Sequence, residues 1–384
     1  MFRAQVGGAM KVWLLSTMSW PFRPVDIPSP FPASLFDPAQ ATQLYRDYIS
    51  LFRQADELGY EGIFIAEHHY NRTGTAPSPN LMAAAIATHT ERARIGLMGN
   101  CLPLHAHPVR LAEELAMIDV LSGGRLVSGF LRGNTGEYHA YNVDISKARG
   151  MFEEAWDLIV KAWTDPEPFA WHGVHYDYEV VSILPRPIQQ PHPPIFTTAS
   201  SAEGIEWAAR HRVPMLTAFS PTEHIAQTFA YYRKYAQEQC GWTPTPEFNG
   251  MSRHVYVAPT DAQARDEGDQ FMADYYHASI ERPTDQQAFR AMDAARYTGR
   301  SFDYKGGTHV SRPRMETVDC ERLLRDGYCI VGSPDTVTRA IKEQQRITGA
   351  GNLLTYLPWG NMSLDQASKS IELFAKEVLP NLID

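Results

Sequence analysis

The sequence is poor in cysteine, and this shortage excludes two common kinds of small-domain architecture. Its 384 residues include only Cys101, Cys240, Cys320 and Cys329, and no two of them have CxxC spacing. Scattered cysteines argue against a zinc ribbon and against a disulfide scaffold. They are expected of a protein from a reducing compartment, so we predict a cytoplasmic location.

The chain also lacks a basic excess and a long apolar run. It carries 35 basic and 44 acidic side chains, a formal net charge of −9, and no dense Lys/Arg run, so no nucleic-acid partner is expected. No stretch reaches the roughly 18 to 20 consecutive apolar residues of a membrane helix. The first residues also lack the apolar core of a signal peptide. A composition with 44% hydrophobic and 21% charged residues instead indicates a globular core.

Short apolar runs alternate with amphipathic stretches along most of the chain. Strands are predicted at residues 12–16, 62–66, 93–99, 125–130, 195–198, 214–218, 251–257 and 352–356. Helices are predicted at residues 40–58, 80–90, 108–122, 146–163, 202–210, 222–239, from 261, 334–347 and 363–378. Eight strand–helix units predict an α/β protein of the (β/α)8 TIM-barrel class, with a doubly wound open sheet as the alternative.

The chain is longer than a bare barrel, which needs about 250 residues. No shift in composition marks a boundary, so residues 1–384 are interpreted as one domain with two insertions. Residues 165–194, rich in proline, histidine and aromatic residues, predict a hairpin and a connector. Residues 280–326 are polar and poorly periodic, and they are predicted to form a lid whose aromatic side chains line a substrate pocket: Phe289, Tyr297, Phe302 and Tyr304.

In a TIM barrel the chemistry lies at the C-terminal ends of the strands. Glu67, His68 and His69 follow the second predicted strand, and a carboxylate beside imidazoles suits acid–base work. A metal site, as in a metal-dependent barrel hydrolase, is the alternative. Adjacent histidines point apart on an extended chain and no third ligand stands out by its spacing, so no metal is predicted.

Two other strand ends carry groups that suit an anion. Arg132 follows the fourth predicted strand and offers a planar fork of donors. Ser200 and Ser201 precede the helix at 202–210, where free N–H groups and the helix dipole favour negative charge. Ser201 alone is equally well explained as a simple N-cap. With Arg132 on the neighbouring strand end, the two serines predict a two-sided phosphate clamp.

Two further strand ends have features that suit a flat ligand. Gly99 and Asn100 follow the third strand and tolerate unusual backbone geometry, so either a flat ligand approaches the main chain there or the pair forms an ordinary turn. Trp359 follows the last strand, where its indole either flanks a planar ring or covers the core.

Glu67, His68 and His69, together with Arg132, Ser200 and Ser201, lie in a series of motifs that resembles the bacterial luciferase-like flavin monooxygenases. The series runs from about residue 11 to 382 and comprises EGIFIAEHHY, RARIG with LPLHAHPVRLAEE, IDVLSGGRLVSGFLRGN, ASSAEGIEWAA, GSPDTV and ELFAKEVLP. The resemblance implies a TIM barrel that uses reduced FMN (FMNH2) and molecular oxygen. It also implies a partner, a separate NAD(P)H-dependent flavin reductase that delivers the reduced flavin, and a homodimer.

The resemblance assigns roles to individual residues. His68 stands near the reactive face of the flavin as the catalytic candidate, with Glu67 beside it. Arg132 and the serines Ser200 and Ser201 grip the flavin phosphate.

Other family features fall on the remaining strand ends. A non-prolyl cis peptide under the flavin ring is expected near Gly99 and Asn100. Leu131 and Trp359 complete the predicted flavin-binding set. Light-emitting alpha chains have a reactive cysteine where this chain has Leu131, so light emission on a long-chain aldehyde is not expected.

The predicted activity is insertion of one oxygen atom of O2 into a small organic substrate through a flavin peroxide, with water excluded from the site. Two alternatives remain within the same barrel. One is a deazaflavin-dependent dehydrogenase, and the other is a flavin-binding partner subunit without catalytic activity.

Overall fold

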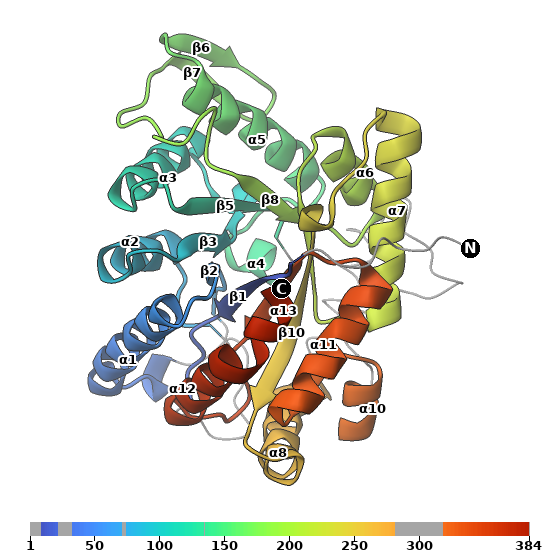
Figure 1. Cartoon of the computed structure of the whole chain (residues 1–384). Coiled ribbons are helices and arrows are strands. Elements are labelled where there is room, and N and C mark those ends of the chain that lie inside the picture. Colours follow the sequence, from blue (N-terminus) through green and yellow to red (C-terminus); the bar gives the residue numbers. More distant parts are fainter. Residues whose placement is uncertain (1–8, 22–32, 71–73, 134, 281–317, 384) are drawn as a thin grey trace.

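Eight parallel strands close into a barrel in the computed structural model, which describes residues 9–21, 33–70, 74–133, 135–280 and 318–383 (Figure 1). The barrel order is β1-β2-β3-β5-β8-β9-β10-β12, and β12 pairs with β1 to complete the circle. The bounds of these strands are β1 Lys11–Ser16, β2 Gly62–Ala66, β3 Arg94–Met98, β5 Leu126–Leu131, β8 Ile195–Thr198, β9 Met215–Ala218, β10 Asn249–Val257 and β12 Asn352–Tyr356.

Helices surround the strands on the outside (Figure 1). Their bounds are α1 Pro38–Glu57, α2 Pro79–His89, α3 Pro108–Leu121, α4 Thr135–Ala140, α5 Ala148–Thr164, α6 Ala202–Arg210, α7 Thr222–Cys240, α8 Asp261–Ile280, α10 Cys320–Arg325, α11 Pro334–Thr348, α12 Leu364–Leu373 and α13 Pro380–Ile383. Shorter helical turns lie at η1 Ala33–Leu35, η2 Leu102–Leu104, η3 Pro246–Phe248 and the π-helical η4 Phe374–Val378.

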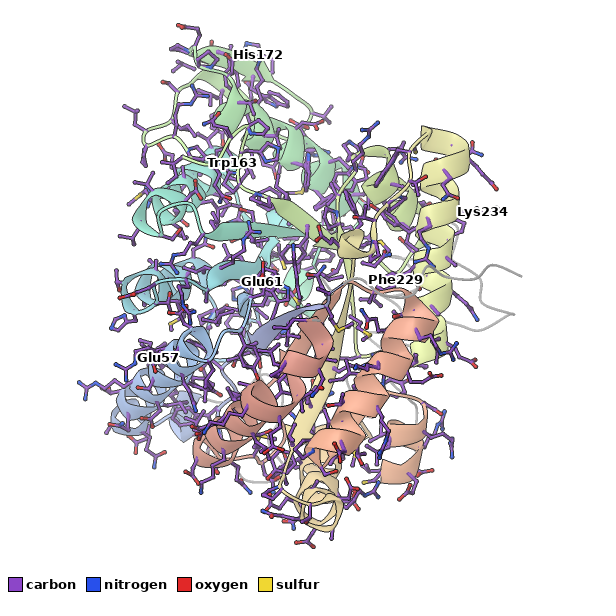
Figure 2. The ribbon with its side chains drawn as sticks, viewed as in Figure 1. Glu57, Glu61, Trp163, His172, Phe229 and Lys234 are labelled. Atoms are coloured by element: carbon purple, nitrogen blue, oxygen red, sulfur yellow. The ribbon has the colours of Figure 1, made fainter. Side chains whose placement is uncertain are left out.

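Each long helix turns one side to the barrel. On α7, Phe229 is fully buried while Lys234 is exposed on the outer side (Figure 2). Local sequence sets where several helices begin: Ser333 and Ser363 accept hydrogen bonds from the backbone N–H groups of Thr336 and Gln366. Such side-chain caps satisfy donors that the first helical turn leaves unpaired.

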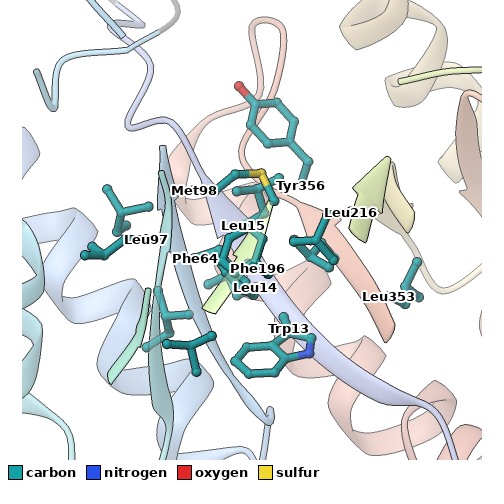
Figure 3. Close-up of a cluster of buried hydrophobic side chains, with 14 of the residues drawn as sticks. Trp13, Leu14, Leu15, Phe64, Leu97, Met98, Phe196, Leu216, Leu353 and Tyr356 are labelled. Atoms are coloured by element: carbon teal, nitrogen blue, oxygen red, sulfur yellow. The ribbon is translucent and has the colours of Figure 1, made fainter. Parts of the chain in front are cut away.

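The interior of the barrel is filled by large apolar side chains from several strands (Figure 3). The ring of Phe64 lies 4.8 Å from Trp13 and 5.0 Å from Phe196, in the second case edge to face. Gly96 makes room for Phe64, because a Cβ at that position would come within 2.3 Å of its ring. The barrel is therefore a packed core, and a ligand must bind at its mouth.

The predicted TIM barrel is confirmed, and all eight predicted strands are barrel strands. Closure between β12 and β1 rules out the open sheet. The hairpin predicted within 165–194 is the antiparallel pair β6 Phe169–His172 and β7 Asp177–Val181, which projects beyond α5 in Figure 1.

Several short elements were not predicted, among them β4 Asn100–Cys101, α4, α10, α13 and the strand β11 Cys329–Gly332. The strand β11 pairs with the C-terminal half of β10. Elements of two to six residues carry too little periodicity to be recognised. Of the predicted lid, residues 281–317 and their four candidate aromatic side chains lie outside the described residues. Within the described ranges, no helix combines the length and apolar character needed to cross a membrane.

Candidate active site

An irregularity between β3 and β5 shapes the barrel mouth. Gly96 pairs with Val127, but the pairing resumes in β4 with Asn100 opposite Phe130, so residues 97–99 face only residues 128–129. One extra residue on one strand is a bulge, and bulges redirect the side chains that follow them. The Met98–Gly99 peptide within it is cis, as expected near Gly99 and Asn100.

Asn100 is the residue that the bulge redirects. Its side chain is 1% exposed, and neither its Oδ1 nor its Nδ2 atom has a hydrogen-bond partner among the described residues. A buried amide without partners is costly, because its donors and its acceptor have all lost water. Both hydrogen-bonding functions of the Asn100 amide are therefore left unused by the described residues.

A cavity of about 290 Å³ lies between the C-terminal ends of β8 and β9 and the first turns of α6 and α7. Arg132, Ser200 and Ser201 all line it, so the structure brings the predicted clamp residues together. Ser201 is also the N-cap of α6 and accepts a hydrogen bond from the N–H group of Gly204, 3.3 Å away. A hydroxyl that accepts one bond can still donate its proton, so the cap and the anion-binding roles are compatible.

Arg149 is a second cation of this cavity that the sequence reasoning missed. It lies in the first turn of α5, next to Glu153 at 3.4 Å and to Glu203 of α6 at 3.2 Å. No sequence motif distinguishes a helical arginine that lines a cavity from a helical arginine that faces solvent. Only the contact between α5 and α6 shows that Arg149 lies at the cavity. On the far wall, burial lowers the pKa of His224, which favours a neutral imidazole.

The acidic partners of the two adjacent histidines come from different parts of the chain. Glu67 pairs with His69, with Oε1 2.8 Å from Nε2, and its other oxygen accepts the N–H group of Cys101 at 2.8 Å. His68 instead pairs with Glu137 of α4, with Nδ1 3.1 Å from Oε1. Among the described residues, the carboxylate that contacts His68 is thus that of Glu137, while its sequence neighbour Glu67 contacts His69.

The helix α4 contacts both ends of the site. Its Tyr138 hydroxyl donates to the backbone carbonyl of Arg132, and the Tyr141 hydroxyl, just after the helix, lies 3.0 Å from Nδ1 of His69. Gly133 connects Arg132 to this region with a φ of +93°, a conformation that favours glycine. A Cβ there would lie 3.2 Å from the ring of Tyr138, so the turn also requires the small residue.

The structure decides between the two alternatives for Trp359. Its side chain is fully buried, its Nε1 donates to the carbonyl of Val255 at 3.0 Å, and its ring lies 4.9 Å from that of His254. It covers the core, and the suggestion that it flanks a planar ligand is wrong because the indole is enclosed by protein. Leu131, the last residue of β5, is half-buried and pairs in register with Cys101.

No group of three or more histidine, cysteine, aspartate or glutamate side chains arranged to hold a metal occurs in the described part of the chain. None of the four cysteines forms a disulfide. The mouth of the barrel thus offers hydrogen-bond donors, cations and imidazoles.

Comparison with known proteins shows the family to which the chain belongs. The profile of the luciferase-like monooxygenases matches residues 31–350, so the chain belongs to that family. It is 26% identical to the alkanal monooxygenase alpha chain of Photorhabdus luminescens over 89% of this chain and 92% of the relative. It is 30% identical to the oxygenase component of the flavin-dependent trigonelline monooxygenase of Acinetobacter baylyi, over 58% of this chain and 62% of that protein.

Among solved structures, the monooxygenase RslO1 from Streptomyces bottropensis superposes with a TM-score of 0.73 at 27% identity, covering 97% of this chain and 99% of that one. The protein is therefore an enzyme, a flavin-dependent monooxygenase with a TIM-barrel fold.

Proposed function

We propose that this protein is the oxygenase component of a two-component system that uses reduced FMN and O2 to insert one oxygen atom into a small organic substrate. A separate NAD(P)H-dependent flavin reductase would supply the reduced flavin. The observation that carries the choice of FMN is the cavity that contains Arg132, Arg149 and the start of α6. Two cations and a helix N-terminus suit a terminal phosphate, which FMN has and riboflavin lacks.

The residues at the mouth fit the rest of a flavin. Gly99 brings the backbone of the bulge close to β5, since a Cβ there would lie 2.6 Å from the carbonyl oxygen of Gly129. Asn100 supplies a donor and an acceptor that no described residue uses, which suits the polar edge of the flavin ring.

Each group in the chain then has a defined task. Arg132, Arg149, Ser200 and Ser201 hold the phosphate and so fix the position of the ring over Gly99. His68, with a third of its side chain exposed, holds or accepts a proton at Nε2 on the open side of the mouth. When bound, reduced FMN supplies the electrons and the site of oxygen activation.

The name of the trigonelline relative supports a partner reductase, because an oxygenase component implies a second component. A homodimer is the second partner that we propose. Leu81 of α2 and Met117 and Leu121 of α3 are 74%, 55% and 51% exposed on neighbouring helices. Exposed apolar side chains on two neighbouring helices favour burial against a second copy.

An anaerobic titration followed by exposure to oxygen tests the function. Wild-type protein is titrated with reduced FMN and, as a phosphate-free comparison, with reduced riboflavin. The complex is then mixed with O2, and the return of the oxidised flavin spectrum and the yield of hydrogen peroxide are measured. We expect preferential binding of FMN, and reoxidation slower than that of free flavin.

Arg132→Ala is expected to weaken FMN binding about 10- to 100-fold, the loss expected for hydrogen bonds to a charged group. It should leave riboflavin binding unchanged. Arg210→Ala is the matched control, because Arg210 lies at the exposed end of α6 and pairs with Tyr235. Reoxidation at the rate of free flavin, or binding of a deazaflavin in place of FMN, would overturn the proposal.

A further inference from the structure

We propose that Glu137 is a positioning residue that fixes the tautomer and the orientation of His68; this inference rests on the proposed function. Glu137 lies on α4, and 69 residues separate it from His68 along the chain. Its carboxylate is 4% exposed, so water does not compete strongly for its oxygens.

Hydrogen-bond chemistry determines which nitrogen carries the proton. An ionised carboxylate only accepts, so the contact between Oε1 of Glu137 and Nδ1 of His68 requires the N–H group to be on Nδ1. In the neutral ring this leaves the lone pair on Nε2. The contact occupies Nδ1, while the His68 side chain as a whole keeps a third of its surface exposed. His68 is thereby prepared to accept a proton at the mouth of the barrel.

Other contacts keep the carboxylate of Glu137 in place. Its second oxygen lies 3.6 Å from the thiol sulfur of Cys101, on β4 beside Asn100. One residue further along α4, Tyr138 donates to the carbonyl of Arg132. The same short helix therefore connects the arginine of the cavity to the histidine. A phosphate that orders Arg132 would also order α4, and through Glu137 it would order His68.

Glu67 and His69 form a matched pair beside this one. Their contact is 2.8 Å, but both side chains are buried, at 5% and 7% exposed. His69 also has Tyr141 at its other nitrogen, so neither of its nitrogens is left for a ligand. Glu67 of this pair also accepts the backbone N–H group of Cys101. The pair is a control for Glu137 and His68, because it is a second carboxylate–imidazole contact whose imidazole is not exposed.

The tautomer is measured directly on the flavin-free protein. Long-range 1H–15N spectra of protein labelled in its histidine rings report which nitrogen is protonated, and loss of signals in His68→Ala identifies His68. At a pH where the ring is neutral, we expect Nδ1–H in the wild type and a mixture of both tautomers in Glu137→Gln, whose amide can also donate. Glu67→Gln should leave the His68 signals unchanged. An unaltered tautomer in Glu137→Gln would overturn the inference.

A double-mutant cycle tests whether Glu137 acts through His68. After mixing with O2, Glu137→Gln is expected to return to the oxidised spectrum about tenfold faster than wild type, with little change in affinity for FMN. In the His68→Ala background the same substitution should have no further effect. Glu137→Asp should recover part of the wild-type behaviour. An equal effect of Glu137→Gln with and without His68 would show a merely structural role and overturn the inference.

The two proposals fail in different ways. If wild-type protein neither binds reduced FMN nor slows its reoxidation, the proposed function fails. If wild type does both and Glu137→Gln behaves like wild type, only the role of Glu137 fails.

Discussion

The carbonyl oxygen of Leu97 lies so close to Gly129 that a Cβ on the glycine would come within 1.9 Å of it. The Phe196 ring closes the same space, 2.5 Å from that position. This contact allows β3 and β5 to approach each other at the bulge that precedes Asn100. The close approach of β3 and β5 at the mouth of the barrel therefore requires a residue without a side chain at position 129.

Gly129→Ala is expected to destabilise the protein by about 1–3 kcal/mol or more, because the backbone must move to accept the methyl group. The same movement should displace Asn100 and weaken FMN binding. Thermal unfolding and an FMN titration measure the two effects. Ser128→Ala, one residue earlier, is the control: its hydroxyl is buried without a partner among the described residues, so its removal should cost little. Equal stability of both variants would contradict the prediction.

Arg149→Ala is expected to weaken FMN binding about tenfold or more while leaving riboflavin binding unchanged. Loss of the cation also leaves the carboxylate of Glu203 unneutralised beside the cavity. Arg149→Ala combined with Glu203→Gln should therefore bind FMN better than Arg149→Ala alone. If the single variant binds FMN as wild type does, Arg149 does not contact the phosphate.

Trp359→Phe is expected to reduce stability by about 1–3 kcal/mol, because the carbonyl of Val255 loses its donor inside the core. Affinity for FMN should not change, since the indole is enclosed by protein. Urea unfolding and the flavin titration separate the two effects. A large loss of FMN affinity with unchanged stability would show instead that Trp359 contacts the ligand.

Asp56 is expected to contribute to the stability of the fold in a pH-dependent way. Burial alone would raise the pKa of this carboxyl, but the backbone N–H groups of Glu91, Arg92 and Ala93 together lower it. Because the pKa of Asp56 is lowered in the folded state, its contribution to the free energy of unfolding is complete above the pKa of the carboxyl in the unfolded chain, about 3.9. It is lost as the pH falls through the folded pKa.

Asp56→Asn should therefore cost about 1–3 kcal/mol near neutral pH. The difference from wild type should shrink at about pH 3, where the carboxyl begins to protonate. Urea unfolding of both proteins at the two pH values measures this. A difference that stays constant with pH would show that the charge of Asp56 does not matter.

Leu81→Asp is expected to shift the proposed homodimer toward monomer, because a charge would have to be buried between the two copies. Sedimentation equilibrium measures the change. Leu184→Asp is the control, since Leu184 is 83% exposed and lies outside α2 and α3. If wild type is monomeric at all accessible concentrations, the apolar side chains of α2 and α3 do not form a dimer interface.

Local features of the chain were enough to predict the barrel and the cavity between Arg132 and the start of α6. Strand and helix periods, N-caps such as Ser201 and Ser333, and glycines at helix ends are local features, and local features can be read along the chain. Because parallel barrel strands all end at the same mouth, position alone was enough to predict that Arg132 and Ser201 share a cavity.

Tertiary structure decided the partners and directions of the remaining groups. It paired His68 with Glu137 and not with its neighbour Glu67, turned Trp359 into the core, and brought Arg149 to the cavity that Arg132 lines. Each of these outcomes depends on the register between β3, β4 and β5 and on how the helices pack. Register and packing arise from contacts between distant segments, and no spacing along the chain records them.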